Sequence, residues 1–558
     1  MQLNSTTIFF SNGSWGYKMN VLLKSSYIFD TERKTTFAGF ILIEGTRIKD
    51  VGPLDATPTN LPAETTIIDC HDQMIIPGFI DAHIHFYLSA LLHAGHLTHV
   101  TGTTEEAVAQ QVPQIPVTHG WKIGIGWFSS DFGQQVYPTK ATIDHYCDEV
   151  PVMLISGDAH SIWLNSKGME TLEITTDSVP TGISGEALME DGELTGCFLE
   201  AVAINYLAEV LQSFQANSHS TYLSYMKQLN RYGITTIGDV ALTGESWDDL
   251  IYPELYQKVA EKATLRAVFY PAMRTEIEHL TDIYQNYRSE KVQMGGVKQF
   301  FDGVTSTHTA LLKSEYETPY FTGDMGMPLI AIEKMRQLIF LANQQDWPMR
   351  IHTIGDQAIH QALSFFNESH ARFPLSAGKN NTLEHLEVMD PADLSLVAQD
   401  NLVLSVQPSH LLVGYETLDE EVGPQRASQM FPFQSFLAHD AVVAFGTDSP
   451  VVIDVSPLDS IYYAVARKEK NGYPVEGLMP SEVMNVADAL VAHTADAARA
   501  ISRQDIGSIK VGQLADLCIL SKNILPLSEK ELLEVEVTAT IFNGAFVYQK
   551  DEASQQNF

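Results

Sequence analysis

Basic residues are scarce in this chain. Its 558 residues include 34 lysines and arginines against 69 aspartates and glutamates, which gives a formal net charge of −35. Nucleic acids and anionic membranes bind proteins through basic surfaces, so this deficit argues against either partner. Most of the negative charge is expected to form a solvated acidic surface. Metal cations and neutral or cationic small molecules remain as expected ligands.

Cysteines and long apolar runs are also scarce. The four cysteines, Cys70, Cys147, Cys197 and Cys518, are far apart and form no CxxC motif. This spacing favours reduced thiols and a cytoplasmic setting over a disulfide framework. No apolar run approaches the ~18 residues of a membrane span. Residues 1–18 lack a basic segment followed by a long apolar one, so we expect an N-terminal extension, with Met19 as an alternative start, and no secretory signal.

Short apolar strands alternating with helical segments are what the chain does contain. Its length suggests two or three domains. Apolar strands that alternate with helices indicate parallel pairing with the helices outside. Eight strands of this kind predict an α/β fold, a TIM (β/α)8 barrel. They are expected at residues 74–86, 234–240, 265–272, 296–304, 348–356, 381–387, 401–409 and 441–450.

Both ends of the chain have a different pattern, with short strands between glycine and aspartate breakers. We expect residues 19–73 and 495–558 to pair into one small β-sandwich-like domain. The barrel then takes residues 74–494. Residues of about 100–215 are too many for an ordinary loop after the first strand, so they are expected to be an insertion.

The first predicted barrel strand ends in His83-Ile84-His85. Side chains two apart on a strand point to the same face, so both imidazoles would converge on one point. The pair alone is better explained as two buried, hydrogen-bonded histidines. The apolar segment before it, the adjacent Asp81 and the residues at later strand ends favour a divalent transition metal instead.

Other polar residues lie where the later barrel strands end, and these are Lys298, His352, His385 and Asp448. Each alone has a structural interpretation: a satisfied buried histidine, a salt-bridged histidine, a turn aspartate or a snorkelling lysine. Catalytic residues of a TIM barrel lie at the C-terminal ends of its strands, so together they predict one site. The lysine ammonium has no lone pair and is no ordinary ligand.

Several segments resemble the amidohydrolase superfamily of metal-dependent hydrolases, and within it the large branch that includes N-substituted formamide deformylase. They are PGFIDAHIHF, GVKQFFDG, HTIGDQAI, LEHLE, AFGTDSPV and IGSIKVGQLADLCIL, and the resemblance extends over about residues 20–548. It implies one or two divalent ions, usually zinc. The implied ligands are His83, His85, His352, His385 and Asp448. Lys298 stands where many members have a lysine carboxylated by CO2, which can bridge two cations.

The resemblance also implies an enzymatic function. Metal-activated hydroxide would attack the carbonyl of a small molecule, and Asp448 would carry the proton to the leaving amine. We expect hydrolysis of an amide or formamide-type C–N bond. Hydrolysis of an ester, carbamate or cyclic amide at the same site is the alternative. A non-catalytic, amidohydrolase-like binding protein is disfavoured because all six site positions are retained.

Candidate substrate-binding residues are assigned less directly. Asp158-Ala159-His160 resembles an Asp-Gly-His motif of the branch, and His308 stands where the branch often has an arginine. A structural role is the alternative in each case, such as a core aromatic for Trp127. The candidates are Trp127, Asp158, His160, Asp302, His308 and His410. A homodimer is the default expectation for the assembly.

Overall fold

The structure is a computed structural model that describes residues 20–62, 64–132, 137–181, 184–244, 248–453 and 456–550. The alternative start Met19 and the tail 551–558 lie outside the described residues. The helices are α1 (Phe86–His93), α2 (Glu105–Ala109), α3 (Lys140–Tyr146), α4 (Ser166–Thr171), α5 (Glu200–Gln212), α6 (Ser218–Arg231), α7 (Pro253–Val259), α8 (Glu278–Asn286), α9 (Ile332–Gln344), α10 (Asp356–Arg372), α11 (Leu418–Glu421), α12 (Pro424–Ala427), α13 (Phe433–Ala438), α14 (Pro457–Ala466), α15 (Val486–Ala492), α16 (Ala495–Ala500) and α17 (Glu529–Leu532).

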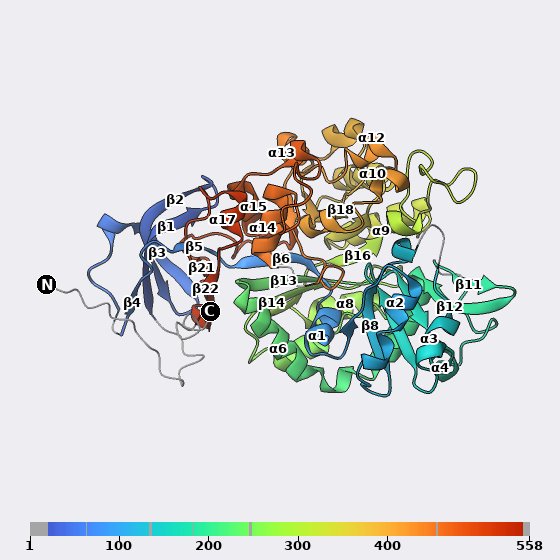
Figure 1. Cartoon of the computed structure of the whole chain (residues 1–558). Coiled ribbons are helices and arrows are strands. Elements are labelled where there is room, and N and C mark those ends of the chain that lie inside the picture. The colour runs from blue at the N-terminus through green and yellow to red at the C-terminus, as the bar shows by residue number, and fades with distance from the viewer. Residues whose placement is uncertain are drawn as a thin grey trace.

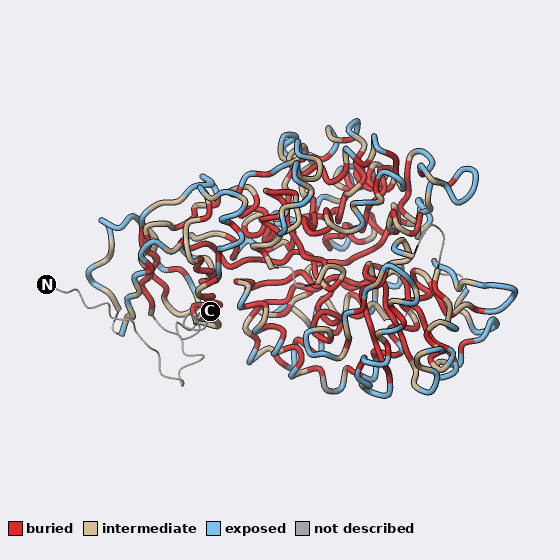
Figure 2. Tube along the Cα trace, in the orientation of Figure 1, coloured by how far each residue is buried: buried red, intermediate tan, exposed pale blue. Residues whose placement is uncertain are grey.

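The eight strands predicted for the barrel are present and form what we call the parallel core. They are β6 (Phe79–Ile84), β13 (Ile234–Val240), β14 (Arg266–Tyr270), β16 (Val297–Phe300), β17 (Met349–Thr353), β18 (Asn381–His385), β19 (Leu402–Val406) and β20 (Val443–Phe445), with the short β15 (Val292–Met294) before β16. Nearly all their residues are buried, as expected for apolar parallel strands covered by helices. Figure 2 shows this buried interior between the more exposed helices and loops.

The parallel core consists of two sheets, β15-β14-β13-β6 and β16-β17-β18-β19-β20, and not of one closed sheet. One seam has a parallel bridge between Ala272 and Lys298. Pro271 precedes this bridge and has no N–H to extend the ladder. At the other seam, the backbone N–H groups of Thr447 and Asp448 donate to the His83 carbonyl. The ends of the two sheets are therefore linked by a few hydrogen bonds.

Strands from both ends of the chain form a separate eight-stranded sheet, the terminal sheet, in which the blue and red segments of Figure 1 lie side by side. Its path is β23-β22-β21-β5-β1-β2-β3, with β4 paired to β1. The bounds are β1 (Val21–Asp30), β2 (Thr35–Glu44), β3 (Arg47–Pro53), β4 (Thr66–Asp69), β5 (Met74–Pro77), β21 (Leu517–Leu520), β22 (Val537–Phe542) and β23 (Ala545–Gln549). The exact domain limits stay a prediction.

The predicted continuous strand over residues 74–86 is wrong, because the chain changes sheets at Gly78. Residues before it form β5 in the terminal sheet, antiparallel to β21, and residues after it form β6 in the parallel core. A Cβ at Gly78 would lie 2.4 Å from Thr235 Oγ1. Only glycine therefore lets the chain pass this close to β13 at the crossing.

A six-stranded sheet lies within the region expected to be an insertion, at the lower right of Figure 1. We call it the third sheet, counting after the parallel core and the terminal sheet. Its order is β11-β12-β10-β9-β8-β7. The strands are β7 (Thr98–His99), β8 (Lys122–Trp127), β9 (Val152–Ser156), β10 (Ser161–Leu164), β11 (Ala187–Glu190) and β12 (Glu193–Leu199). Val108, Trp127, Leu154 and Trp163 are part of an apolar cluster of this sheet.

The four cysteines carry free thiols. Among the described residues, every helix is too short or too polar to cross a membrane.

Candidate active site

The ends of the parallel strands bring the six predicted metal-site residues to one cavity of about 120 Å³. All six are buried, with relative exposures between 0% for Lys298 and 8% for His85. They come from β6 or the residue after it, β16, β17, β18 and the loop that follows β20. In order, they are His83, His85, Lys298, His352, His385 and Asp448.

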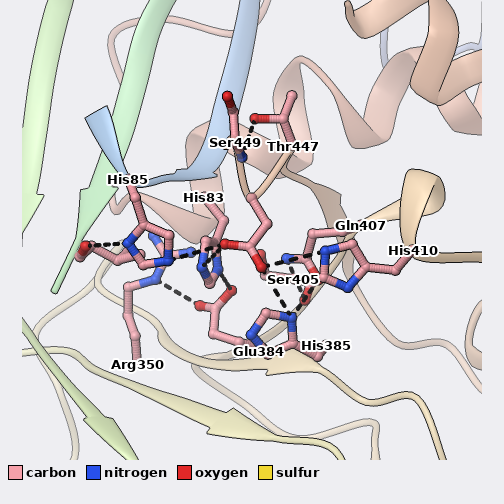
Figure 3. A network of polar contacts seen from close by, with 12 residues as sticks. His83, His85, Arg350, Glu384, His385, Ser405, Gln407, His410, Thr447 and Ser449 are labelled. Atoms are coloured by element: carbon pink, nitrogen blue, oxygen red, sulfur yellow. Dashed lines mark hydrogen bonds and ion pairs between the residues drawn. The ribbon is translucent and has the colours of Figure 1, made fainter. Parts of the chain in front are cut away.

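Asp448 contacts both His83 and His85, which Figure 3 shows next to each other. Its Oδ1 atom is 3.2 Å from His83 Nε2 and 3.1 Å from His85 Nε2. Ligands held about 2.0–2.1 Å from a tetrahedral zinc ion lie about 3.3 Å from one another. Donor atoms of His83, His385 and Asp448 also lie within 4.8 Å of one another. Nitrogen and carboxylate donors at this spacing fit a divalent transition metal.

Hydrogen bonds fix which nitrogen of each β6 histidine faces the cavity. His83 Nδ1 lies 2.7 Å from Glu384 Oε2, and His85 Nδ1 lies 3.0 Å from the Val240 carbonyl oxygen. Both acceptors place the proton on Nδ1 and leave the lone pair on Nε2. In both residues, Nε2 is the atom next to Asp448. The two imidazoles therefore present unprotonated nitrogens to the cavity, as a metal ligand must.

Glu384 is itself held by Arg350, whose Nε lies 2.7 Å from Glu384 Oε1, and both residues are fully buried. Burial alone would raise the pKa of Glu384, but the charges of Arg350 and His83 outweigh it and hold the pKa well below its ordinary range. The carboxylate is therefore ionised and only accepts hydrogen bonds. Sequence analysis missed this role, although a charged residue inside an apolar strand is a signal that it must have a buried partner.

His385 and His352 show the same preset arrangement with different acceptors. His385 Nδ1 lies 2.9 Å from the Gln407 side-chain oxygen, which leaves Nε2 with the lone pair. His352 is turned the other way: its Nε2 lies 3.2 Å from the Gly303 carbonyl oxygen, so Nδ1 is free. Burial holds the pKa values of both histidines well below the ordinary value, so both are neutral and able to bind a metal.

Lys298 is fully buried, and its Nζ atom has no hydrogen-bond partner among the described residues. It lies 4.7 Å from the centre of the Phe300 ring. Burial lowers its pKa to about 8, which increases the fraction of neutral amine at neutral pH. A buried, unpaired amine is costly unless the cavity supplies a partner. The environment therefore fits a modified or metal-bridging lysine better than a structural one.

The loop that carries Asp448 is tied to β6 by Asp81. Thr447 donates to both Asp81 oxygens, from its backbone N–H at 3.0 Å and from its hydroxyl at 2.6 Å. Asp448 itself adopts a left-handed backbone conformation with φ 56°, as does His385 with φ 73°. Such strained residues persist only where surrounding contacts fix them, and they cluster at functional sites.

His410, Asp158 and His160 also line the cavity, as predicted, although binding of a substrate by them remains a prediction. His160 comes from the loop before β10, and its Nδ1 lies 2.7 Å from Glu200 Oε2. Burial would lower the pKa of His160, but the charge of Glu200 outweighs it and raises the pKa to about 9. The third sheet therefore contributes one wall of the cavity.

Trp127 and Asp302 do not line this cavity. Trp127 packs in the third sheet, where its Nε1 donates to the Leu154 carbonyl over 3.0 Å. The Asp302 carboxylate is occupied by three backbone N–H groups, those of Leu311, Ile354 and Gly355. Its position after β16 suggested a role at the cavity, but it fixes the loops around the cavity instead.

His308 does not line this cavity either. Its Nδ1 lies 2.6 Å from Asp324 Oδ2. The ring stacks on Tyr316 and Tyr320, with ring centres 4.0 and 3.7 Å apart. These contacts anchor the loop that follows β16. They explain the histidine at this position without a role in substrate binding.

Comparisons with known proteins agree with this architecture. The chain is 29% identical over 562 residues to protein LONG AFTER FAR-RED 3 of Arabidopsis thaliana, with 96% of this chain and 92% of that protein covered. It is 23% identical to the N-substituted formamide deformylase of Arthrobacter pascens, with 95% and 98% covered.

Solved structures include a metal-dependent hydrolase of uncharacterised function from Pyrococcus horikoshii OT3. It matches with a TM-score of 0.69 at 21% identity, with 91% of this chain and 99% of that chain covered, which supports an α/β fold of the TIM-barrel type. A model described as the amidohydrolase family matches residues 66–548. The chain therefore belongs to the amidohydrolase family of hydrolases.

Proposed function

We propose that this protein is a divalent-metal hydrolase that cleaves an amide or formamide-type C–N bond of a small molecule. The observation that carries the proposal is the set of preset donors around the cavity. Four histidines each commit one nitrogen to a fixed acceptor and keep the other free, beside a buried carboxylate. A purely structural histidine cluster has no need of four free lone pairs that line one cavity with a buried carboxylate.

His83, His85, His352, His385 and Asp448 would hold two divalent ions. Lys298 would take part as a carbamate, an anion able to bind cations. This modification joins the neutral amine to CO2 and releases one proton, and the lowered pKa of Lys298 favours it. Zinc is the proposed metal, since imidazole and carboxylate donors suit it.

A bound divalent ion would supply Lewis acidity and a lowered pKa for water. The residues of the chain supply proton transfer and positioning. Burial would raise the pKa of Asp448, but the histidines around it, His83 foremost, outweigh burial and hold the pKa well below its ordinary value. Its carboxylate can accept the proton from the attacking water and donate it to the leaving amine. The products are a carboxylic acid and an amine.

Apolar residues around the site limit the access of water. They include Phe128, Leu242, Phe300, Val413 and Phe431. Together with the small volume of the cavity, they favour a compact acyl group such as formyl next to the metal-site residues. Charges act more strongly in such a cavity than in bulk water.

The replacement Asp448→Asn tests this proposal. We expect kcat on N-formyl and N-acyl amines to fall by about 10²–10⁴-fold because the proton carrier is lost, while most bound zinc remains. Steady-state kinetics and elemental analysis measure the two effects. Asp440→Asn, which changes an exposed aspartate of the loop before β20, is the matched control and should keep wild-type kcat. Undiminished turnover in Asp448→Asn would contradict the proton-carrier role.

A panel of matched substrates tests the bond type. For one acyl group, the amide, ester and carbamate are compared by kcat/KM. We expect the amide or formamide to be the best substrate relative to its uncatalysed rate. Hydrolysis of the ester or carbamate alone would overturn the C–N assignment and keep the metal site.

A further inference from the structure

His410, a residue outside the predicted metal set, lies directly beside Asp448, and Glu387 lies beside His410. His410 Nδ1 lies 3.0 Å from Glu387 Oε1, and His410 Nε2 lies 3.3 Å from Asp448 Oδ2. His410 and Asp448 are 9% and 4% exposed. The imidazole therefore stands between two carboxylates and faces one of them with each nitrogen. Figure 3 shows His410 and His85 at opposite sides of the group.

The local backbone explains how these residues reach their places. The chain leaves β18 through left-handed conformations at His385 and Leu386, and the next residue is Glu387. His410 lies in the 3₁₀ turn Pro408–Leu412 that follows β19. Gln407 precedes this turn and holds His385. Residues three apart lie on the same side of a 3₁₀ turn, so one turn contacts both His385 and Asp448.

The two oxygens of Asp448 have different neighbours. Oδ1 faces His83 and His85, whereas Oδ2 faces His410. The terminal torsion of an aspartate is soft and roughly two-fold, so the side chain alone does not fix which way its carboxylate plane turns. The contacts of its oxygens must do so. His410 Nε2 lies 3.3 Å from Oδ2, closer than His385 Nδ1, which is 4.0 Å away.

We infer that His410, itself held by Glu387, is a positioning residue that fixes the orientation of the Asp448 carboxylate toward the metal site. This inference rests on the proposed metal-dependent function. It adds to the six predicted positions a residue that orients one of them. His410 was predicted to bind substrate. Its two nitrogens both face carboxylates of the protein, and its Nε2 faces Oδ2, the Asp448 oxygen other than the one beside His83 and His85.

The same atoms allow a competing assignment. Donor atoms of His385, Glu387 and His410 lie within 4.8 Å of one another, so the three could hold a cation themselves. In that case His410 would be a ligand. Metal stoichiometry distinguishes the two assignments.

The test measures zinc affinity and kinetics in His410→Ala, His410→Gln and Glu387→Gln. Zinc alone is the binding probe, with its Kd measured by competition against a chromophoric chelator. Loss of an outer contact of a ligand typically weakens metal affinity about 10–100-fold. We expect His410→Ala to raise the Kd at least tenfold and to lower kcat, with KM changed much less and the number of zinc ions unchanged. His410→Gln, which keeps one donor, should recover part of both effects, and Glu387→Gln should show a smaller loss.

The control is His360→Gln, which removes a similar histidine–carboxylate pair away from the cavity. His360 Nδ1 lies 2.9 Å from Asp393 Oδ1, and the His360 side chain is 40% exposed. This variant should keep the wild-type Kd and kcat. If His410→Ala does not fold, the Gln variants at positions 410 and 387 still give the result.

Two outcomes would overturn the inference. A wild-type Kd and kcat in His410→Ala would show that Asp448 needs no such contact. Loss of one whole equivalent of zinc at saturation, with unchanged affinity of the rest, would make His410 a ligand. Because zinc binding is measured without a substrate, failure of the inference is separable from failure of the proposed amide hydrolysis. A wild-type protein that binds zinc but hydrolyses no amide would count only against the proposed reaction.

Discussion

β6 has a buried histidine near each end: His83 belongs to its C-terminal part, and His493 packs beside its start. The two histidines have opposite surroundings. His83 at the C-terminal end faces Asp448 and the other donors of the cavity. His493 lies at the start of β6, where its Nδ1 is 3.3 Å from the Ile80 carbonyl oxygen and its ring packs edge-on against Phe79 and Phe445. Burial of a histidine is therefore no sign of function, whereas convergence of its free nitrogen with other donors is.

This contrast agrees with the division of labour in the TIM-barrel type of fold, in which one end of the strands carries chemistry and the other carries stability. At the cavity end, the contacts of each histidine leave one lone pair available. At the other end, His493 is enclosed by aromatic rings and backbone. Changes at the two ends should consequently affect different measurements.

The replacement His83→Ala should have the largest effect. It removes a proposed metal ligand and leaves the Glu384 carboxylate without its imidazole partner. We expect bound metal and turnover to be lost together, while the far-ultraviolet circular dichroism of the folded protein is retained. Elemental analysis and an activity assay check this. Full metal content in the variant would show that His83 is not a metal ligand. The contrast with His493 would then not hold.

The replacement His493→Gln should act on stability alone. Burial lowers the pKa of His493 to about 4 in the folded protein, against about 6.5 in an unfolded chain. The unfolded chain therefore binds a proton first as pH falls, and stability is lost from pH 6.5 downward until about pH 4. Between pH 7 and pH 5 this contribution is about 2 kcal/mol.

Urea unfolding of the wild type and His493→Gln at pH 7 and pH 5 measures that difference. The variant should lose less stability than the wild type over this interval and keep its metal content. An identical pH dependence in both proteins would show that His493 does not titrate as its surroundings require. A changed metal content in His493→Gln would contradict the separation of metal binding and stability between the two ends of β6.

The replacement Trp127→Phe should have the smallest effect. Trp127 is 1% exposed within the third sheet, and its indole donates to Leu154. Loss of that hydrogen bond should cost about 1 kcal/mol in the free energy of unfolding, with kcat and KM unchanged. Thermal unfolding and kinetics check this. A changed KM would restore Trp127 as a substrate contact.

The parallel strands were predictable because their apolar runs are nearly continuous and several carry a polar residue at or just after their C-terminal end. The positions of His352, His385 and Asp448 follow from this geometry, because the C-terminal ends of the strands of a barrel meet at one face. Asp302 and His308 come just after β16 and obey no such constraint. The Asp302 carboxylate accepts from backbone N–H groups of later loops, and His308 pairs with Asp324, which also comes later in the chain.

Pairing across strands was the other part that the sequence could not reveal. Arg350 and Glu384 meet only because β17 and β18 are neighbours in register. Gly78 similarly looks like one glycine in an apolar run, and its role appears only beside Thr235. Contacts of this kind depend on tertiary structure and have no local pattern.

The measurement that tests the account most directly is the metal content of chelator-free protein by elemental analysis, together with intact mass under mild conditions. We predict close to two zinc ions per chain and a mass gain of one CO2 on Lys298. One ion without added mass would contradict the carbamate bridge and leave Lys298 as an unmodified charge. No bound divalent metal, even after reconstitution, would contradict the central claim that these preset donors form a metal site.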